Sequence, residues 1–475
     1  MLCLAAAVRL AHIDEVTLGS DSLGQFLGAW SVLQGGTPVP PNPEGGHSLW
    51  VLGLPCVIGA SSLKQVFTHR FVLGALVAPL GAWAAHRLAS PTRWAWLAGA
   101  LAGLLLAWDP GLVDTLVVSF RGYGAPEFIA VAMVGISVGG RAGAVVAGAA
   151  FVAATGQHPM SAGVGLGLAV LMWAQADRAA LGFAVAAVAL CALPRLHWIW
   201  QLGSCGAGFV ECLGSVATGS AEPDVSAITM LRRAFWDRGV VELGLGASLA
   251  VLTGLVAAAS HRHGRRLAWA GILAVLGVLA LGLSIQGLRP YHLRAAMPVV
   301  VVAAAVGFSL RPWALGVAGL CLFFGGIRLE APHGPAGDLA AVDALGAALA
   351  QGGEAVRVEA VWFEDPVGVE PAGVVLAARQ AGLSTDLLTI EETAPLVLLV
   401  NGPASGELPV PLPATDGELD GIAREAVPGT RVVRFVGLAE ARAWIQSAST
   451  PPVVSGGSFD WVKAMKPGVG AYEGL

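Results

Sequence analysis

The sequence predicts an α-helical polytopic membrane protein with about eleven transmembrane helices and a small C-terminal α/β soluble domain. Hydrophobic residues make up 55% of the chain and charged residues only 12%, whereas soluble domains carry about 25% charged residues. Eleven apolar segments lie within residues 1–327. Short turns that carry arginine alternate with longer loops that hold nearly all the acidic residues, and this alternation predicts which loops share a side of the membrane.

The first apolar segment is short for a membrane span of about 20 residues. Either the start of the chain lies further upstream or this helix is tilted. Met1–Leu10 has no basic region and no Ala-x-Ala site, so we do not expect a removed signal peptide. The expected spans are 1–13, 66–85, 94–108, 126–139, 142–156, 161–175, 179–194, 239–259, 267–285, 293–309 and 313–327.

Positive charge predicts the orientation of these spans. Five turns are short and contain arginine, and the positive-inside rule places them in the cytoplasm; they are 85–93, 139–141, 175–178, 260–266 and 309–312. The sequence therefore predicts a multi-pass protein of the cytoplasmic (inner) membrane with its N-terminus inside. The outer loops are then 14–65, 109–125, 157–160, 195–238 and 286–292, and everything from residue 328 also lies outside.

Two regions of the membrane core depart from simple spans. Ser22 and Gln25 fit a capping box, and the apolar residues that follow predict a helix along the membrane surface. The next apolar run, 48–60, contains Pro55 and is either interfacial or re-entrant. Segments 126–139 and 142–156 are rich in glycine and alanine, so they pack as a tight hairpin that either crosses fully or does not.

The composition changes after residue 328, where alternating helix and strand patterns predict a domain over 328–448. A tail rich in proline, glycine and serine follows over 449–475. The expected helices are 338–351, 371–380, 416–425 and 438–447, and the expected strands are 356–363, 396–400 and 431–436.

Several functions are disfavoured by composition. The net charge is −5 and no basic stretch suits nucleic acid. No spacing of histidine, cysteine and carboxylates fits a metal site. Cys205 and Cys212 share one outer loop, where they form either a disulfide or two free thiols.

Asp14 and Glu15 are the first candidate for chemistry, because they follow the first span on the outer side. Carboxylates at the edge of a membrane helix are costly and are usually functional. A carboxylate there can act as a general base, taking a proton from an acceptor hydroxyl while a sugar leaves its lipid phosphate. The alternative is a solvated helix end.

An Asp-Glu pair just after the first helix, followed by an outer amphipathic helix that starts at Ser20-Asp21, resembles the GT-C fold glycosyltransferases. The protein O-mannosyltransferases and lipid A aminoarabinose transferases belong to this group. The resemblance covers residues 1–327 in architecture, although the local motif is only two residues long. Asp109-Pro110 stands where the group has an acidic residue followed by proline.

The resemblance implies an enzyme that takes a sugar from a polyprenyl-phosphate donor at the outer face of the membrane. It implies Asp14 as catalytic base, Glu15 as its acidic partner and an inverting transfer. The acceptor is then a glycan, a lipid or a protein, and membrane lipid surrounds the enzyme. Some members of the group need a divalent metal, but the mannosyltransferase type generally does not, so we expect no metal and no other cofactor.

Three further polar residues on the outer side are candidates for binding substrate. Asp21 is either a substrate ligand or a helix cap. Asp109 follows the third span and either faces the same cavity as Asp14 or lies in a polar interface loop. His158 lies in a tight outer turn, where it either contacts substrate phosphate or has a structural role.

The segment from Arg289 to Arg294 holds two arginines, Tyr291 and His292 in six residues. Arginine binds phosphate in a fork geometry that lysine cannot match. We therefore expect Arg289 or Arg294 to hold the lipid phosphate of the donor, with Tyr291 and His292 beside it. The alternative is interfacial anchoring by aromatic and basic residues.

Two other classes of function compete with this hypothesis. A transporter or flippase for a lipid-linked or polar substrate would need buried charges in its spans and internal symmetry, and the sequence shows no repeat. A non-catalytic membrane scaffold would need neither the acidic pair nor the arginine cluster on one face.

Overall fold

The computed structural model describes most of the helical core and parts of the C-terminal region. The described residues are 1–13, 63–90, 92–117, 125–157, 159–175, 178–202, 225–284, 288–326, 339–351, 357–362, 396–401, 417–426 and 430–436, with 440, 443, 444 and 447. They belong to two units. The first unit consists of Met1–Leu10, Phe71–Leu116 and Arg121–Pro332. The second unit consists of Ala11–Arg70, Val117–Phe120 and His333–Leu475.

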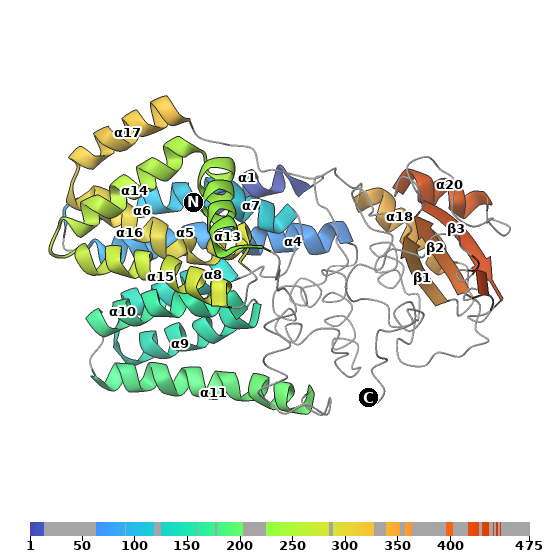
Figure 1. The fold of residues 1–475 in the computed structure, drawn as a ribbon, viewed down its shortest axis with the longest axis horizontal. Helices are drawn as coiled ribbons and strands as arrows, with labels where there is room; N and C mark the ends of the chain where they lie inside the picture. Colours follow the sequence, from blue (N-terminus) through green and yellow to red (C-terminus); the bar gives the residue numbers. More distant parts are fainter. Residues whose placement is uncertain are drawn as a thin grey trace. The chain divides into compact units, whose positions relative to one another are not determined.

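The first unit is a bundle of helices (Figure 1). Its α-helices are α1 (Leu2–Leu10), α4 (Leu63–Ala75, which begins in the second unit), α5 (Val77–Leu88), α6 (Ala95–Trp108), α7 (Pro110–Val117), α8 (Ala125–Val138), α9 (Gly140–Gln157), α10 (Gly165–Gln175), α11 (Arg178–Leu202), α13 (Ala227–Phe235), α14 (Leu245–Ala259), α15 (Arg265–Ser284), α16 (Met297–Leu310) and α17 (Trp313–Gly325). Two 3₁₀ helices, Pro159–Val164 and Pro290–Ala296, and a π-helix, Trp236–Glu242, interrupt them.

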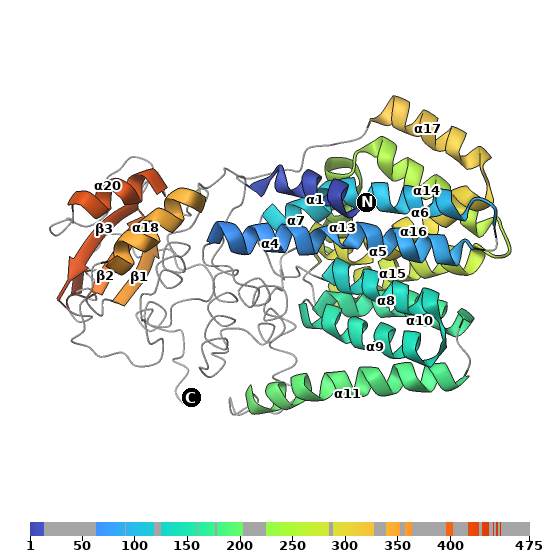
Figure 2. The ribbon, with the colours of Figure 1, turned by 180° about the vertical axis from the view of Figure 1, so that it is seen from behind.

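Helix α16 is the centre of the bundle. Every residue from Met297 to Ser309 is buried, and α16 contacts α5, α6, α8, α14, α15 and α17. A helix that is apolar all round belongs in such a central position. Both views place α11 at one side of the bundle and α17 at the opposite side (Figures 1 and 2).

Small residues let the helices approach closely. A Cβ added at Gly254 of α14 would lie 2.7 Å from the carbonyl oxygen of Ala304 on α16. A Cβ at Gly167 of α10 would overlap the carbonyl of Ala270 on α15. Such contacts are typical of helices in lipid, which associate through close packing because lipid tails are as apolar as the side chains.

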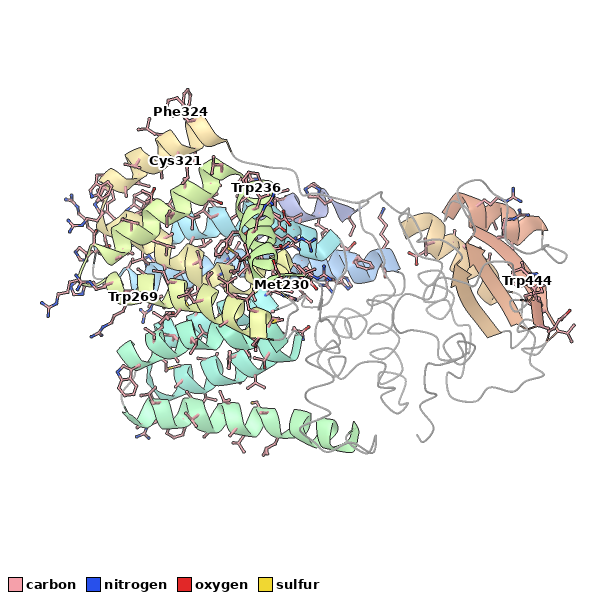
Figure 3. The ribbon with its side chains drawn as sticks, in the orientation of Figure 1. Met230, Trp236, Trp269, Cys321, Phe324 and Trp444 are labelled. Carbon is pink, nitrogen blue, oxygen red and sulfur yellow. The ribbon has the colours of Figure 1, made fainter. Side chains whose placement is uncertain are left out.

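Large apolar side chains cover the outside of the bundle. Phe324 at the end of α17 is 81% exposed, and Trp96, Trp269 and Trp313 are each more than half exposed. Figure 3 labels Phe324 and Trp269 among the side chains of the bundle. Each of these tryptophans follows the last arginine of an arginine-bearing turn by two or three residues. Water would not favour so much exposed apolar surface, and tryptophan gathers at membrane interfaces, so the chain is a membrane protein.

Three described helices are long and apolar enough to cross a membrane: Phe67–Leu88, Arg265–Ser284 and Tyr291–Leu310. The bent pair Ala227–Glu242 and Leu245–Ala259 would make a fourth span. Shorter apolar helices are Ala95–Trp108, Ala125–Val138, Met160–Trp173, Ala179–Leu193 and Trp313–Gly325. The count of eleven spans stays a prediction.

One predicted boundary is wrong, and one helix extends beyond its predicted span. The span expected at 239–259 begins only at Leu245, because residues up to Glu242 form a π-helix and Gly244, with a φ of 84°, bends the chain. The apolar part of α11, Ala179–Leu193, agrees with the span expected at 179–194, and the helix itself continues to Leu202. It passes through Pro194, which helices in membranes tolerate better than helices in water.

The described part of the second unit contains α18 (Leu339–Gln351), α20 (Gly417–Ala426), β1 (Arg357–Trp362), β2 (Leu396–Asn401) and β3 (Thr430–Phe435). The strands form one sheet in the order β1-β2-β3, with β1 parallel and β3 antiparallel to β2. Helix α20 contacts α18 and β3. These elements lie within one or two residues of predicted ones, while the domain limits 328–448 stay a prediction.

Candidate functional site: a buried ion-pair network

Asp109 connects the end of α6 to the start of α7. Its backbone is extended, with φ −62° and ψ 109°, and Pro110 begins the next helix, where its missing N–H costs nothing. The Asp109 Oδ1 atom accepts hydrogen bonds from the backbone N–H groups of Gly111 at 2.9 Å and Leu112 at 3.2 Å. Asp109 therefore caps α7, because it satisfies N–H groups that have no partner inside the helix.

The same carboxylate binds Arg238, which lies 129 positions further along the chain. The Arg238 Nη2 atom lies 2.6 Å from Asp109 Oδ2 and 2.9 Å from Oδ1. Only 4% of the Arg238 side chain and 1% of the Asp109 side chain are exposed. The contact ties the π-helix to the junction of α6 and α7.

Glu242 continues the network from Arg238 to Arg294. Its Oε2 atom accepts from Arg238 Nη1 at 2.8 Å, four residues earlier on the π-helix. Arg294 Nη2 lies 2.7 Å from Glu242 Oε1, and Arg294 Nε lies 3.2 Å from Oε2. This is the fork geometry in which arginine binds a carboxylate or a phosphate most firmly.

A break in the helical path brings Arg238 and Glu242 to this position. Ser226 caps α13 by accepting the N–H of Thr229 at 3.2 Å, and α13 runs directly into the π-helix. The chain then turns by 105° into α14 through Gly244, whose positive φ is a conformation that other residues adopt only with strain. π-Helical turns are uncommon in proteins, and many of those that do occur are at functional sites.

Arg9 adds a cation to the same end of α6. Its Nη2 atom donates to the carbonyl oxygen of Leu106 at 3.1 Å and its Nη1 atom to that of Ala107 at 3.2 Å. The last carbonyls of a helix lack partners within the helix and carry partial negative charge. Arg9 is 1% exposed, and its charge interacts with those of Asp109 and Glu127.

Gly111 allows the network to close. A Cβ at this position would overlap the Nη1 atom of Arg238 and the Oε2 atom of Glu242. These two atoms form the ion pair at the centre of the network, so a side chain at residue 111 would push the pair apart.

The network has no net charge, and its side chains are buried. Two carboxylates, Asp109 and Glu242, face two guanidinium groups, those of Arg238 and Arg294. Buried charges are tolerated only when they are paired and hydrogen-bonded. The network lies at the end of α6 away from the arginine-bearing turn that precedes Ala95, so it belongs to the side of the membrane that the sequence predicts to be outside.

The structure joins two of the predicted site residues through residues that were not predicted. Asp109 and Arg294 are linked by Arg238 and Glu242. Arg289, Tyr291 and His292 lie at or in the 3₁₀ helix that contains Arg294. The remaining predicted site residues, Asp14, Glu15, Asp21 and His158, lie outside the described residues, as do Cys205 and Cys212.

His292 is held on the 3₁₀ helix by its own neighbours. Its Nδ1 atom accepts the backbone N–H of Arg289 at 3.0 Å, and its ring meets that of Tyr291 edge-on at 4.4 Å. A neutral imidazole whose Nδ1 is an acceptor carries its proton on Nε2. His292 is 4% exposed, so its ring is held in place. The Nε2 atom of this ring is therefore an oriented hydrogen-bond donor on a residue two positions before Arg294 in the sequence.

Arg9, Arg238 and Glu242 were missed from the sequence, although a signal was present. Arg9 and Glu242 lie inside the predicted spans 1–13 and 239–259, and an ionisable residue within a span is a functional candidate by default. Arg238 precedes Glu242 by four residues, a spacing that places opposite charges side by side on a helix.

The described residues contain no group of three or more histidine, cysteine, aspartate or glutamate side chains placed to hold a metal ion. The two carboxylates of the network already bind arginine. The arrangement fixes the orientation of the Arg238 and Arg294 guanidinium groups, a type of group that also binds oxyanions.

Comparison with known proteins gives one likeness in fold. Two crystal structures of ArnT from Cupriavidus metallidurans, an aminoarabinose transferase of the GT-C group, match with 15% and 16% identity and a TM-score of 0.48. One is in the apo state, and the other is bound to undecaprenyl phosphate. Each match covers 73% of this chain but only 63% of ArnT. No family model and no curated protein matches the sequence.

Proposed function

We propose that this protein is a membrane glycosyltransferase that moves a sugar from a polyprenyl-phosphate donor to an acceptor at the outer face of the cytoplasmic membrane. The observation that carries the proposal is the buried network of Asp109, Arg238, Glu242 and Arg294 at the predicted outer end of the bundle. Buried charges are expensive in a membrane protein and usually mark a working site.

The acidic pair supplies the base in this proposal. Asp14 follows Arg9 by five residues in the chain, and Arg9 is bonded to the end of α6 beside the network. Asp14 removes the proton from an acceptor hydroxyl, whose oxygen attacks the anomeric carbon of the sugar. Glu15 binds the sugar or the acceptor.

The bond between the anomeric carbon and the phosphate oxygen breaks in the same step. The polyprenyl phosphate leaves with the electron pair, and attack from the opposite side inverts the anomeric centre. Negative charge grows on the leaving phosphate, so cations near it lower the barrier. We assign this role to Arg289 and Arg294, with Tyr291 and His292 lining the same subsite.

The network explains how Arg294 is prepared for this task. Glu242 holds the guanidinium group through two hydrogen bonds, and Arg238 connects Glu242 to Asp109. A group that is oriented before the donor arrives does not have to reorganise during the reaction. The mechanism uses no metal.

A transporter or flippase is the second candidate, and the bent helix pair favours it. Discontinuous helices with buried charges at the break are typical of transporters, and Ala227–Glu242 meets Leu245–Ala259 at 105°. The charges of the ion-pair network lie at helix ends rather than in the middle of spans, which favours an enzyme at the interface.

One experiment separates these candidates. The full chain would be purified into proteoliposomes with undecaprenyl-phosphate sugars labelled in the sugar, and a membrane extract would supply acceptors. A glycosyltransferase releases undecaprenyl phosphate while the label moves to an acceptor. A transporter moves the labelled donor across the bilayer without releasing the phosphate, and that result would overturn the proposal.

The base is tested in the same assay. Asp14→Asn should lower the release of undecaprenyl phosphate by at least about 100-fold, the usual contribution of a general base. Asp343→Asn on α18 removes the same charge outside the proposed site and should leave release unchanged. Full activity of the Asp14→Asn variant would exclude Asp14 as the base.

A further inference from the structure

A cavity of about 420 Å³ lies at the opposite end of the bundle from the ion-pair network. Three parts of the chain surround it: the turn between α5 and α6, the turn between α14 and α15, and the end of α16. All three belong to the first unit. The proposed transfer reaction does not use this cavity.

The segments around the cavity carry only positive charge. Residues 86–94, 260–266 and 309–313 contain six arginines and three histidines but no aspartate or glutamate. Arg93, Arg262 and Arg311 form no ion pair with a carboxylate among the residues that the structure describes. Among the described residues, these segments therefore bring net positive charge to the cavity, in contrast to the balanced network at the other end.

Three of the lining residues can donate hydrogen bonds to an anion. The Arg93 guanidinium lies 5.2 Å from the ring centre of Trp94, which also lines the cavity. His261 Nδ1 accepts the backbone N–H of His263 at 3.3 Å, so the Nε2 of a neutral His261 ring carries the proton. His263 also lines the cavity, and its ring centre lies 5.6 Å from that of His261.

The other lining groups suit the rest of a phosphate ligand. Thr92 and Ser309 donate their hydroxyl protons to the backbone carbonyls of Ala89 and Val306, so the donors that face a ligand are those of the arginine and the two histidines. Val306 and Leu310 contribute apolar surface. Cationic donors above an apolar wall match a phosphate group that is attached to a hydrocarbon chain.

The ionisation of His261 agrees with this electrostatic picture. Burial, the positive charge of Arg311 and the neighbouring His263 together lower the pKa of His261 below its ordinary value. A bound anion would oppose the two electrostatic causes, since it would stabilise the charged imidazole.

We propose that this cavity is a binding site for a phosphate group, carried by the headgroup of an anionic membrane lipid or by a soluble phosphate compound. Basic pockets between membrane helices on the cytoplasmic side suit lipid headgroups. The exposed Trp96, Trp269 and Trp313 near these turns mark the level of the interface, where such headgroups lie.

The two sources of the phosphate are distinguished with two probes on the full chain in neutral detergent. Phosphatidylglycerol is titrated and counted by native mass spectrometry, with diacylglycerol as the lipid that lacks a phosphate. Inorganic ³²P-phosphate is titrated by equilibrium dialysis. Saturable binding of the lipid alone identifies a headgroup site, and binding of both probes identifies a site for phosphate from either source.

A matched pair of variants shows whether the cavity is responsible. Arg93→Gln should weaken binding by about tenfold, the effect of losing one charge-assisted hydrogen bond. Arg141→Gln is the control, because Arg141 lies in the first turn of α9, outside the cavity, and its guanidinium also sits over an aromatic ring, that of Phe183 at 5.4 Å. Absence of binding by either probe, or equal weakening by both variants, would overturn the proposal.

Discussion

Arg294 binds Glu242 through two nitrogen atoms, with Nη2 2.7 Å from Oε1 and Nε 3.2 Å from Oε2. Both side chains are less than one tenth exposed. This pair joins the 3₁₀ helix that leads into α16, the central helix, to the π-helix before α14. It therefore couples the geometry of the proposed phosphate site to the packing of the bundle.

Removing the charge of Glu242 should destabilise the bundle. Glu242→Gln leaves Arg238 and Arg294 without their shared carboxylate, and breaking a buried ion pair from one side costs about 3–5 kcal/mol. The measurement is the thermal unfolding midpoint in detergent. Asp237→Asn, on the same π-helix, is the control and should change the midpoint little. Equal midpoints for the two variants would show that the network adds nothing to stability.

Two substitutions at Asp109 should separate its two roles. Asparagine can still cap α7 with its side-chain oxygen, so Asp109→Asn loses mainly the ion pair with Arg238. Asp109→Ala loses the pair and the cap, and we expect it to cost about 1 kcal/mol more. Unfolding free energies of both variants test this order, and a reversed order would contradict the capping role.

A side chain at residue 111 should disrupt the network by overlap. Gly111→Ala places a Cβ against Arg238 and Glu242, and overpacking of this kind costs about 1–3 kcal/mol. Gly182→Ala on α11 is the control, because a Cβ there meets nothing within 4 Å. Helix propensity alone favours alanine over glycine by about 0.5–1 kcal/mol, so the two variants should shift the unfolding midpoint in opposite directions.

Arg294→Lys tests the proposed phosphate contact rather than the fold alone. Lysine keeps the charge but cannot form the fork. We expect the KM for the polyprenyl-phosphate donor to rise about tenfold, the equivalent of about 1.4 kcal/mol, with a smaller change in the KM for the acceptor. Equal changes in both KM values, or none in either, would leave Arg294 a structural residue.

The predicted orientation can be measured by labelling single cysteines. Arg262 lies in the turn between α14 and α15 and Arg232 on α13, and both are exposed. In a variant without native cysteines, Arg232→Cys should react with an impermeant maleimide added to whole cells. Arg262→Cys should react only after the membrane is opened, and the reverse pattern would invert the topology.

The helices could be predicted where the signal is local. Helix α6 was expected at 94–108 and spans Ala95–Trp108, and α15 was expected at 267–285 and spans Arg265–Ser284. In both cases an apolar run ends at polar residues, so hydropathy marks the ends. Glu242 shows where this fails, because one glutamate among Val240, Val241 and Leu243 does not outweigh its neighbours in an average over a window.

Only two of the four residues of the ion-pair network could be identified from the sequence. Asp109 stood out because it directly follows a predicted span, and Arg294 because it opens one beside Arg289, Tyr291 and His292. Arg9 and Glu242 lie inside predicted spans, where the apolar run hides them. Their importance comes from partners far away in the chain, and a single sequence contains no direct record of such pairs.

The amino-acid sequence alone is enough to identify a membrane protein and to locate its arginine-bearing turns, since hydropathy and helix formation depend on neighbouring residues. Which charges meet depends on the tertiary structure. Asp109 and Arg238 are 129 positions apart, and their contact depends on the π-helix and on the turn at Gly244. The free energy of a buried charge depends on the partner that it finds, and the fold of the whole bundle determines that partner.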